Sequence, residues 1–121
     1  MLLTVGERVW QDFDPRLARM GTGWAGGIAL TEDLCGAVAA AVMLIGARHG
    51  RVTLEDSDQE CLRLVQEFRA RFERELGSLL CRDLKPGPFG PESHRRCAAI
   101  VRRATDILLD LLNDDGGDAV T

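Results

Sequence analysis

The stretch GGIALTEDLCGAVAAAVMLIGARHG, residues 26–50, decides the fold predicted for this chain. Thr31 is a residue type that caps helix N-termini, and Glu32 and Asp33 follow it where acidic side chains favour the positive end of a helix dipole. Gly50 is suited to end the helix. We therefore predict a helix from about Glu32 to His49. Its many alanines and glycines let neighbours approach its backbone closely, as the central helix of a compact bundle requires.

The N-terminal region carries signals for two short helices. Val5, Val9 and Phe13 recur every four residues, which predicts an amphipathic helix over residues 5–13. Asp14 is a good N-cap and Pro15 suits the first position of a second helix. The glycines at 21, 23, 26 and 27 are expected to end it, because glycine suits unusual dihedral angles and close backbone approach.

Two longer stretches carry apolar stripes at helical spacing. Gly77 is expected to end the first helix, and a proline–glycine loop at 85–91 precedes the second. No stretch alternates in the manner of a strand. We predict an all-α, compact bundle of about four to five helices forming a single domain over 1–121, with residues 113–121 as a disordered acidic tail. The two stripes are Cys61, Val65, Phe68, Phe72 and Leu76, and Cys97, Ile100, Val101, Ala104, Ile107, Leu108 and Leu111.

The composition limits the classes of partner. The 121 residues include 19 acidic and 15 basic ones, with a formal net charge of −4. Nucleic acid is not expected as a partner, because phosphate binding requires concentrated positive charge. Fourteen of the fifteen basic residues are arginine, and Lys85 is the single lysine. We draw no function from this bias.

No membrane span and no secretory signal are predicted. The acidic residues at 32 and 33 interrupt the apolar run and leave only residues 34–47 uncharged, which is too short to cross a bilayer. The first residues, MLLTVGERVW, lack the basic start, apolar stretch and cleavage site of a signal peptide. We therefore expect a cytoplasmic protein whose thiols are reduced at rest.

The four cysteines fall into two groups. Cys35, Cys81 and Cys97 each lie near a predicted helix end, beside glycine or proline, where sulfurs from different elements can converge. Cys61 lies inside a regular apolar stripe, where we expect it only to pack. No two cysteines form a C-x-x-C pair, and the spacing of zinc fingers is absent.

Several other residues are candidates for a site around these sulfurs. His94 lies three residues before Cys97, hence on the same helical face, and is the better of the two histidines as a metal ligand. Trp24, among glycines, is either a packing anchor or a flat surface on which a small ligand stacks. A thiol pKa would be lowered by a nearby arginine. The arginines considered for this role are Arg48, Arg82, Arg95 and Arg96.

These residues resemble those of the redox-active family called C_GCAxxG_C_C, named for its cysteines and a Cys-Gly-Ala-x-x-Gly motif. The segments that carry the resemblance are GWAGGI, EDLCGAVAAAVMLIGARHGR, ELGSLLCRDL and RRCAAIVRRATDILLDLL. It spans about residues 5–112 and includes the glycine pair ending at Gly27 and the Cys35–Gly36–Ala37 core. This chain has Ala40 where the motif ends in glycine, and it has no cysteine before Cys35, where the family has its first.

The resemblance implies a small all-helical protein with cysteines capable of redox chemistry or metal binding. Our leading hypothesis is a redox protein in which Cys35 pairs reversibly with Cys81 or Cys97, at a pocket that also includes Gly27, Gly36 and Trp24, and which exchanges electrons with an unidentified redox partner. The first alternative is a module in which Cys35, Cys81, Cys97 and His94 hold a metal ion or an iron–sulfur cluster. The second is a non-catalytic dimerisation module. The small-residue face also favours a homodimer.

Overall fold

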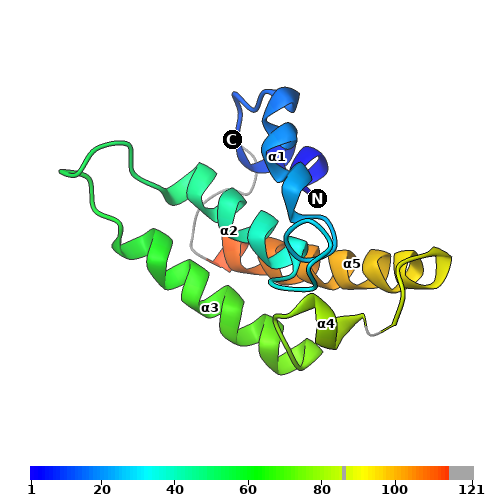
Figure 1. Cartoon of the computed structure of the whole chain (residues 1–121). Helices are drawn as coiled ribbons and strands as arrows, with labels where there is room; N and C mark the ends of the chain where they lie inside the picture. Colours follow the sequence, from blue (N-terminus) through cyan, green and yellow to red (C-terminus); the bar gives the residue numbers. More distant parts are fainter. Residues whose placement is uncertain (86, 115–121) are drawn as a thin grey trace.

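The computed structural model describes residues 1–85 and 87–114. Within them the chain is all-α, as predicted (Figure 1). Five α-helices and one 3-10 helix follow one another in the order α1 (Leu2–Val9), η1 (Pro15–Trp24), α2 (Gly36–His49), α3 (Gln59–Leu76), α4 (Cys81–Leu84) and α5 (Pro91–Asp114).

Helix α2 is the central helix, as its small residues predicted. It contacts α1, η1, α3 and α5, and Figure 1 shows it lying between α1 on one side and α3 on the other. Ala41 and Ile45 on this helix are fully buried. Small side chains allow this close packing on several sides, because neighbouring helices can approach the α2 backbone to a short distance.

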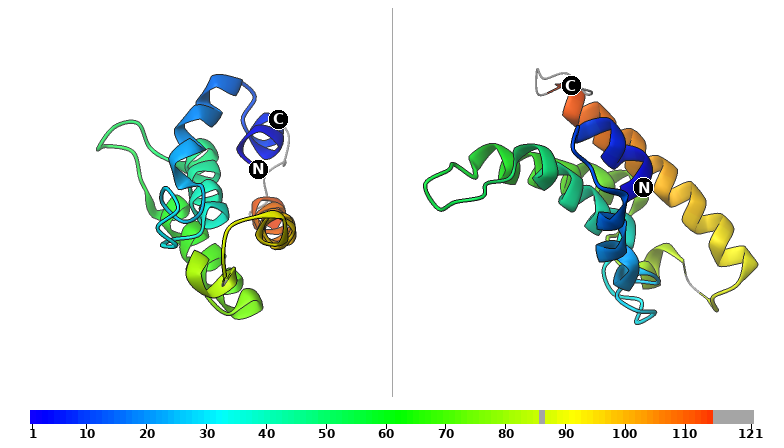
Figure 2. Two further views of the ribbon diagram at one scale, coloured as in Figure 1. Left: turned by 45° about the vertical axis from the view of Figure 1, so that its right-hand side comes forward. Right: turned by 90° about the horizontal axis from the view of Figure 1, so that it is seen from above.

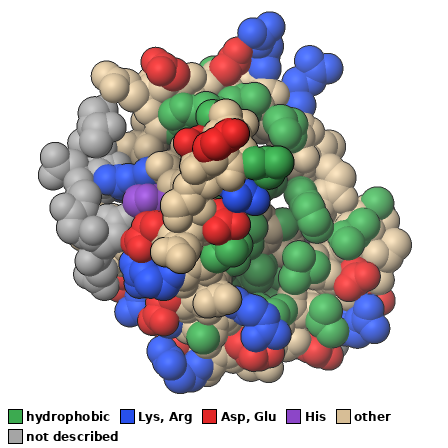
Figure 3. Space-filling view, turned by 90° about the vertical axis from the view of Figure 1, so that its left-hand side faces the viewer, with side chains coloured by type: hydrophobic (Ala, Val, Ile, Leu, Met, Phe, Trp, Pro, Cys, Tyr) green, Lys and Arg blue, Asp and Glu red, His purple; other side chains and the backbone are tan. Residues whose placement is uncertain are grey.

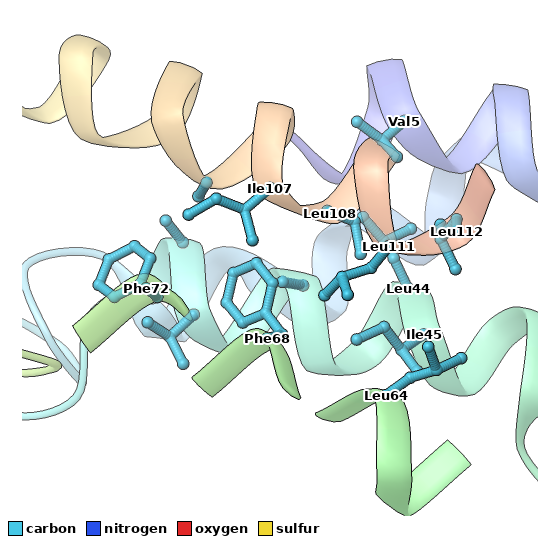
Figure 4. Close-up of a cluster of buried hydrophobic side chains, with 14 of the residues drawn as sticks. Val5, Leu44, Ile45, Leu64, Phe68, Phe72, Ile107, Leu108, Leu111 and Leu112 are labelled. Carbon is cyan, nitrogen blue, oxygen red and sulfur yellow. The ribbon is translucent and has the colours of Figure 1, made fainter. Parts of the chain in front are cut away.

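The core is formed by side chains of α1, α2, α3 and α5 (Figure 4). Both predicted stripes face it. Phe68 and Phe72 of α3 are fully buried and stacked, with ring centroids 5.8 Å apart. Cys61 is partly buried and packs against the same cluster, which agrees with a packing role. The buried hydrophobic residues of α5 are Ile100, Ala104, Ile107, Leu108, Leu111 and Leu112.

Three predicted helix boundaries are confirmed, whereas the end of the first helix and the start of the central helix are wrong. The carboxylate of Asp14 accepts a hydrogen bond from the Arg16 amide at the start of η1. Gly50 and Gly77 are the C-caps of α2 and α3, and Gly77 has the left-handed φ of 91°. The first helix ends at Val9 instead of residue 13, because the chain turns back so that the Phe13 ring lies against residue 6, which has no side chain.

The start of the central helix is also corrected. Helix α2 begins at Gly36, with Cys35 as its N-cap, and does not begin at Glu32. The hydroxyl of Thr31 donates to the carbonyl oxygens of Gly27 and Ile28 instead of capping a helix. The segment before Cys35 pairs with a distant part of the chain, and this pairing prevents it from joining α2.

The connection between α2 and α3 extends away from the bundle (Figures 1 and 2). Its tip is highly exposed, with Val52 94% and Leu54 85% accessible. At the other end of the chain, residues 113 and 114 belong to α5, so the predicted tail begins too early there. The rest of that predicted tail, 115–121, lies outside the described residues. None of the helices in the described part has the length and apolar character needed to span a bilayer.

Candidate functional site

A short antiparallel pairing holds the segments of Cys35 and Cys81 together. Leu34 and Leu80 form an isolated β-bridge. On its two sides the Cys35 amide donates to the Leu79 carbonyl at 2.8 Å, and the Cys81 amide donates to the Asp33 carbonyl at 2.8 Å. Cys35 and Cys81 are therefore diagonal neighbours on one face of the pairing. Cys35 then enters α2, and Cys81 begins α4.

A pocket of about 590 Å³ lies beside this pairing, and Cys35, Cys81 and Cys97 all line it. Cys35 and Cys81 are buried, at 7% and 2% exposure, whereas Cys97 on α5 is half-buried. Three cysteines from three separate segments thus line one cavity. Its size is in the range of sites for small ligands. The wall also includes Trp24, Gly27, Gly36 and Ala40.

Two glycines allow the backbone to approach closely at this pocket. A Cβ atom on Gly27 would lie 2.7 Å from the Cys81 Cβ and 2.6 Å from the Asp33 carbonyl oxygen. A Cβ atom on Gly36 would lie 3.1 Å from the Trp24 carbonyl oxygen. Gly27 also has a φ of 75°, a conformation that favours glycine. These glycines hold the loop and the start of α2 near the sulfurs.

The loop that carries Gly27 is strained. It begins with Gly26 and Gly27 in the left-handed region, and non-glycine residues continue there at Ile28 (φ 61°), Ala29 (φ 51°), Leu30 (φ 66°) and Glu32 (φ 63°). Such a conformation costs about 1–2 kcal/mol for each residue that bears a side chain, and for a β-branched residue such as Ile28 it is a genuine outlier. Strained backbone of this kind concentrates at functional sites.

The electrostatic surroundings of Cys35 keep its thiol protonated. Burial raises its pKa, and the neighbouring Cys81 and Cys97 sulfurs act in the same direction. The amide groups of Ala37 and Val38 at the start of α2 lower the pKa but do not offset the burial. The Cys35 side chain makes no capping hydrogen bond to the start of α2. Cys35 is therefore less ionised at neutral pH than an ordinary thiol.

The predicted arginine neighbours are not on the pocket wall. Arg82 donates through Nε to the Glu32 carbonyl at 3.1 Å, which ties α4 to the strained loop. Arg95 pairs with Glu92 on the surface. Arg48 and Arg96 are likewise absent from the residues that line the pocket.

The residues proposed as metal ligands do not fit a preformed metal centre. His94 is exposed and does not line the pocket. Among the described residues, no three or more histidine, cysteine or acidic side chains are grouped so as to hold a metal ion.

One residue of the pocket was missed by the sequence analysis. Lys85 is buried, with 8% of its surface exposed, and lines the same cavity as the three cysteines. The available signal was compositional, since Lys85 is the single lysine in an arginine-rich chain. Its position depends on α4, because the Lys85 amide donates to the Cys81 carbonyl at 2.8 Å and ends that short helix.

The structure thus defines an all-α protein in which three cysteines line one pocket. Comparison with protein families identifies its family. The family model described as "Putative redox-active protein (C_GCAxxG_C_C)" matches residues 1–111, and the chain belongs to this family. Neither the curated proteins nor the solved structures that were compared with the chain include a match.

Proposed function

We propose that this protein is a thiol–disulfide redox protein that cycles between free thiols and a Cys35–Cys81 disulfide. The observation that supports the proposal is that Cys35 at the N-cap of α2, Cys81 of α4 and Cys97 of α5 line one pocket. Membership of a family described as redox-active supports it.

The antiparallel pairing favours Cys81 as the partner of Cys35. Diagonal neighbours in such a pairing lie about 7–8 Å apart, and a disulfide requires Cα atoms about 4.4–6.8 Å apart. A small backbone movement therefore suffices. Both residues lie where a main-chain hydrogen bond joins the two segments, so the thiols stay close in the reduced protein.

Cys97 is suited to react first with an external disulfide, because it is the most accessible of the three. Its thiolate attacks one sulfur of R–S–S–R, forms a mixed disulfide and expels RS⁻. The Cys81 thiolate then attacks the Cys97 sulfur and expels the second RS⁻. Finally, the Cys35 thiolate attacks the Cys81 sulfur and releases Cys97.

The cycle balances with an external dithiol as reductant. In the forward direction, two protein thiols and R–S–S–R give one protein disulfide and two RSH, after the two thiolates take up the two protons. A small dithiol then reduces the Cys35–Cys81 bond and becomes a disulfide itself. Cys35 acts last in the forward direction, in agreement with its raised pKa.

Disulfide mapping after oxidation tests the proposal. Reduced protein is treated with one equivalent of 2-hydroxyethyl disulfide, blocked with iodoacetamide, digested and analysed by mass spectrometry. We expect a single bridge between Cys35 and Cys81. Cys35→Ser should stop the relay at a Cys81–Cys97 bridge. The absence of any intramolecular bridge, or a bridge that includes Cys61, would contradict the mechanism.

Cys61→Ser is the matched control. Cys61 packs against the core from α3 and does not line the pocket. The variant should form the same Cys35–Cys81 bridge at the same rate as the natural chain. Metal analysis of protein purified without oxygen, with a visible absorption spectrum, tests the metal and iron–sulfur hypothesis on the same sample. A stoichiometric metal bound by the cysteines would overturn the disulfide cycle.

The predictions of a cytoplasmic location and a homodimer also belong to this proposal. A reducing compartment would make the Cys35–Cys81 bond a reversible switch. The small-residue face of α2 is already buried within one chain, including Ala37, Ala39 and Ala40, so a dimer would use other surfaces. Figure 3 shows apolar side chains gathered on one face among charges of both signs. Light scattering of the reduced protein tests the dimer.

A further inference from the structure

The chemistry of the pocket wall indicates which small disulfides fit it. Apart from the three cysteines and the two threonines at positions 4 and 22, the side chains that line it are apolar or absent, with one exception. That exception is Lys85, the one charged side chain among the described lining residues. A ligand that matches this wall has an apolar body and a single group that suits an ammonium.

Lys85 has no acidic partner among the described residues. Its ammonium lies 6.0 Å from the centroid of the Phe89 ring, a weak cation–π contact. Phe89 in turn lies against Gly26 of the pocket, since a Cβ atom there would be 3.2 Å from its ring. The Lys85 side chain is mostly buried in the pocket wall, so its ammonium is held at the cavity without an oppositely charged neighbour among the described residues. A bound anion would supply the missing charge.

We propose that the pocket accepts a small acidic disulfide, whose carboxylate pairs with the Lys85 ammonium while its S–S bond lies against the cysteines. This inference rests on the proposed function. Lys85 follows Cys81 by one helical turn, and its amide is hydrogen-bonded to the Cys81 carbonyl. Helix α4 and its C-cap thus supply a sulfur and a cation one turn apart, which suits a substrate with a carboxylate a few bonds from its disulfide.

Three small disulfides that differ in charge test the inference. They are 3,3′-dithiodipropionate, 2-hydroxyethyl disulfide and cystamine, which are anionic, neutral and cationic. The second-order rate constant for oxidation of the reduced protein is measured for each. We expect the acidic disulfide to react about tenfold faster than the neutral one, as one charge-assisted contact provides, and the cationic one to react slowest. The chain's net charge of −4 would by itself give the opposite order.

Substitution of Lys85 identifies the source of the preference. Lys85→Met should reduce the ratio of the acidic to the neutral rate constant to about 1, whereas Lys85→Arg should keep most of it. Arg95→Met is the control, because Arg95 is an exposed cation of α5 outside the pocket, and the ratio should not change. A ratio unaffected by Lys85→Met, or an equal loss for all three disulfides, would overturn the carboxylate contact.

A ligand without sulfur separates this inference from the redox proposal. Suberate has the length of dithiodipropionate but carries methylenes in place of its sulfurs. At millimolar concentration it should slow alkylation of Cys97 by iodoacetamide in the natural chain and not in Lys85→Met. Protection by suberate without disulfide exchange would support the anion site and contradict the redox cycle. Exchange without charge preference or protection would support the cycle and contradict the anion site.

Discussion

Cys35 occupies a position with two opposing influences on its sulfur. As the N-cap of α2 it lies beside the amides of Ala37 and Val38, which favour the thiolate. Burial and the neighbouring sulfurs favour the thiol more strongly, so the net effect is a raised pKa. A helix start alone therefore does not make a cysteine reactive, because the dipole effect is outweighed when the sulfur is removed from water.

The raised pKa of Cys35 has a measurable effect on stability. In the unfolded chain the thiol ionises near the ordinary pKa of about 8.5, but in the folded protein it keeps its proton to higher pH. Stability from this group is complete below the unfolded pKa and is lost as pH rises to the folded pKa. We expect the free energy of unfolding of the reduced protein to fall above pH ~8.5. Denaturant titrations at several pH values measure it.

Cys35→Ala is the matching variant for this measurement. Its stability should be lower at neutral pH, because the buried side chain is shortened. Its free energy of unfolding should fall less steeply with pH in the alkaline range, since one titrating thiol is removed. Equal slopes for the two proteins would show that Cys35 ionises alike in the folded and unfolded chains.

At the scale of elements, the loop between η1 and α2 determines how close the sulfurs lie. Gly27 is packed closely in this loop, with Asp33 and Cys81 where a side chain would extend. Gly27→Ala should destabilise the protein by roughly 2–4 kcal/mol, through the left-handed φ and the steric conflict together. It should also slow formation of the Cys35–Cys81 bridge, because Cys81 must move. Chemical denaturation and disulfide mapping measure the two effects.

Gly23→Ala provides the control for that substitution. Gly23 lies in η1 of the same region, but nothing lies within 4 Å of a Cβ atom placed on it, and its φ is not left-handed. Its replacement should change stability by less than about 0.5 kcal/mol. If both variants lost the same stability, the close approach at Gly27 would not be the cause.

Local sequence signals predicted most of the elements because they depend on neighbouring residues. Asp14 with Pro15, Gly50 and Gly77 mark helix ends through their own backbone preferences, and the stripes of α3 and α5 follow helical periodicity. The start of α2 could not be predicted this way. Thr31 is a residue type that caps helices. The bridge between Leu34 and Leu80 joins segments far apart in the chain, and no local signal predicts it.

The pocket was predictable only in part. The grouping of Cys35, Cys81 and Cys97 followed from their positions near predicted helix ends and was supported by the resemblance to a family, although no two of them form a C-x-x-C pair. Lys85 escaped notice because its importance arises from burial beside those sulfurs. A lysine in a proline–glycine loop normally lies in solvent, so nothing local distinguishes it.

For the whole molecule, a Cys35–Cys81 disulfide would enclose both α2 and α3. Cross-linking residues 35 and 81 restricts the unfolded chain over this loop, which in the chain-entropy model stabilises the folded state by about 4 kcal/mol. We expect the oxidised protein to melt at a clearly higher temperature than the reduced protein, by circular dichroism. A double variant, Cys35→Ser with Cys81→Ser, should melt at the same temperature under both conditions. A lower melting temperature for the oxidised protein would indicate that the bridge distorts the fold.

The left-handed loop before α2 has a consequence for how the pocket opens. Ile28, Ala29, Leu30 and Glu32 hold unfavourable backbone angles. Releasing this segment from the fold therefore relieves backbone strain, whereas unfolding a regular helix relieves none. Partial opening, in which one region detaches while the rest stays native, begins in such regions. Since Gly27 lies against Cys81, detachment of the loop would uncover a buried sulfur and leave the bundle intact. Exposure of Cys81 to solvent would then depend on how often this loop detaches from the start of α4.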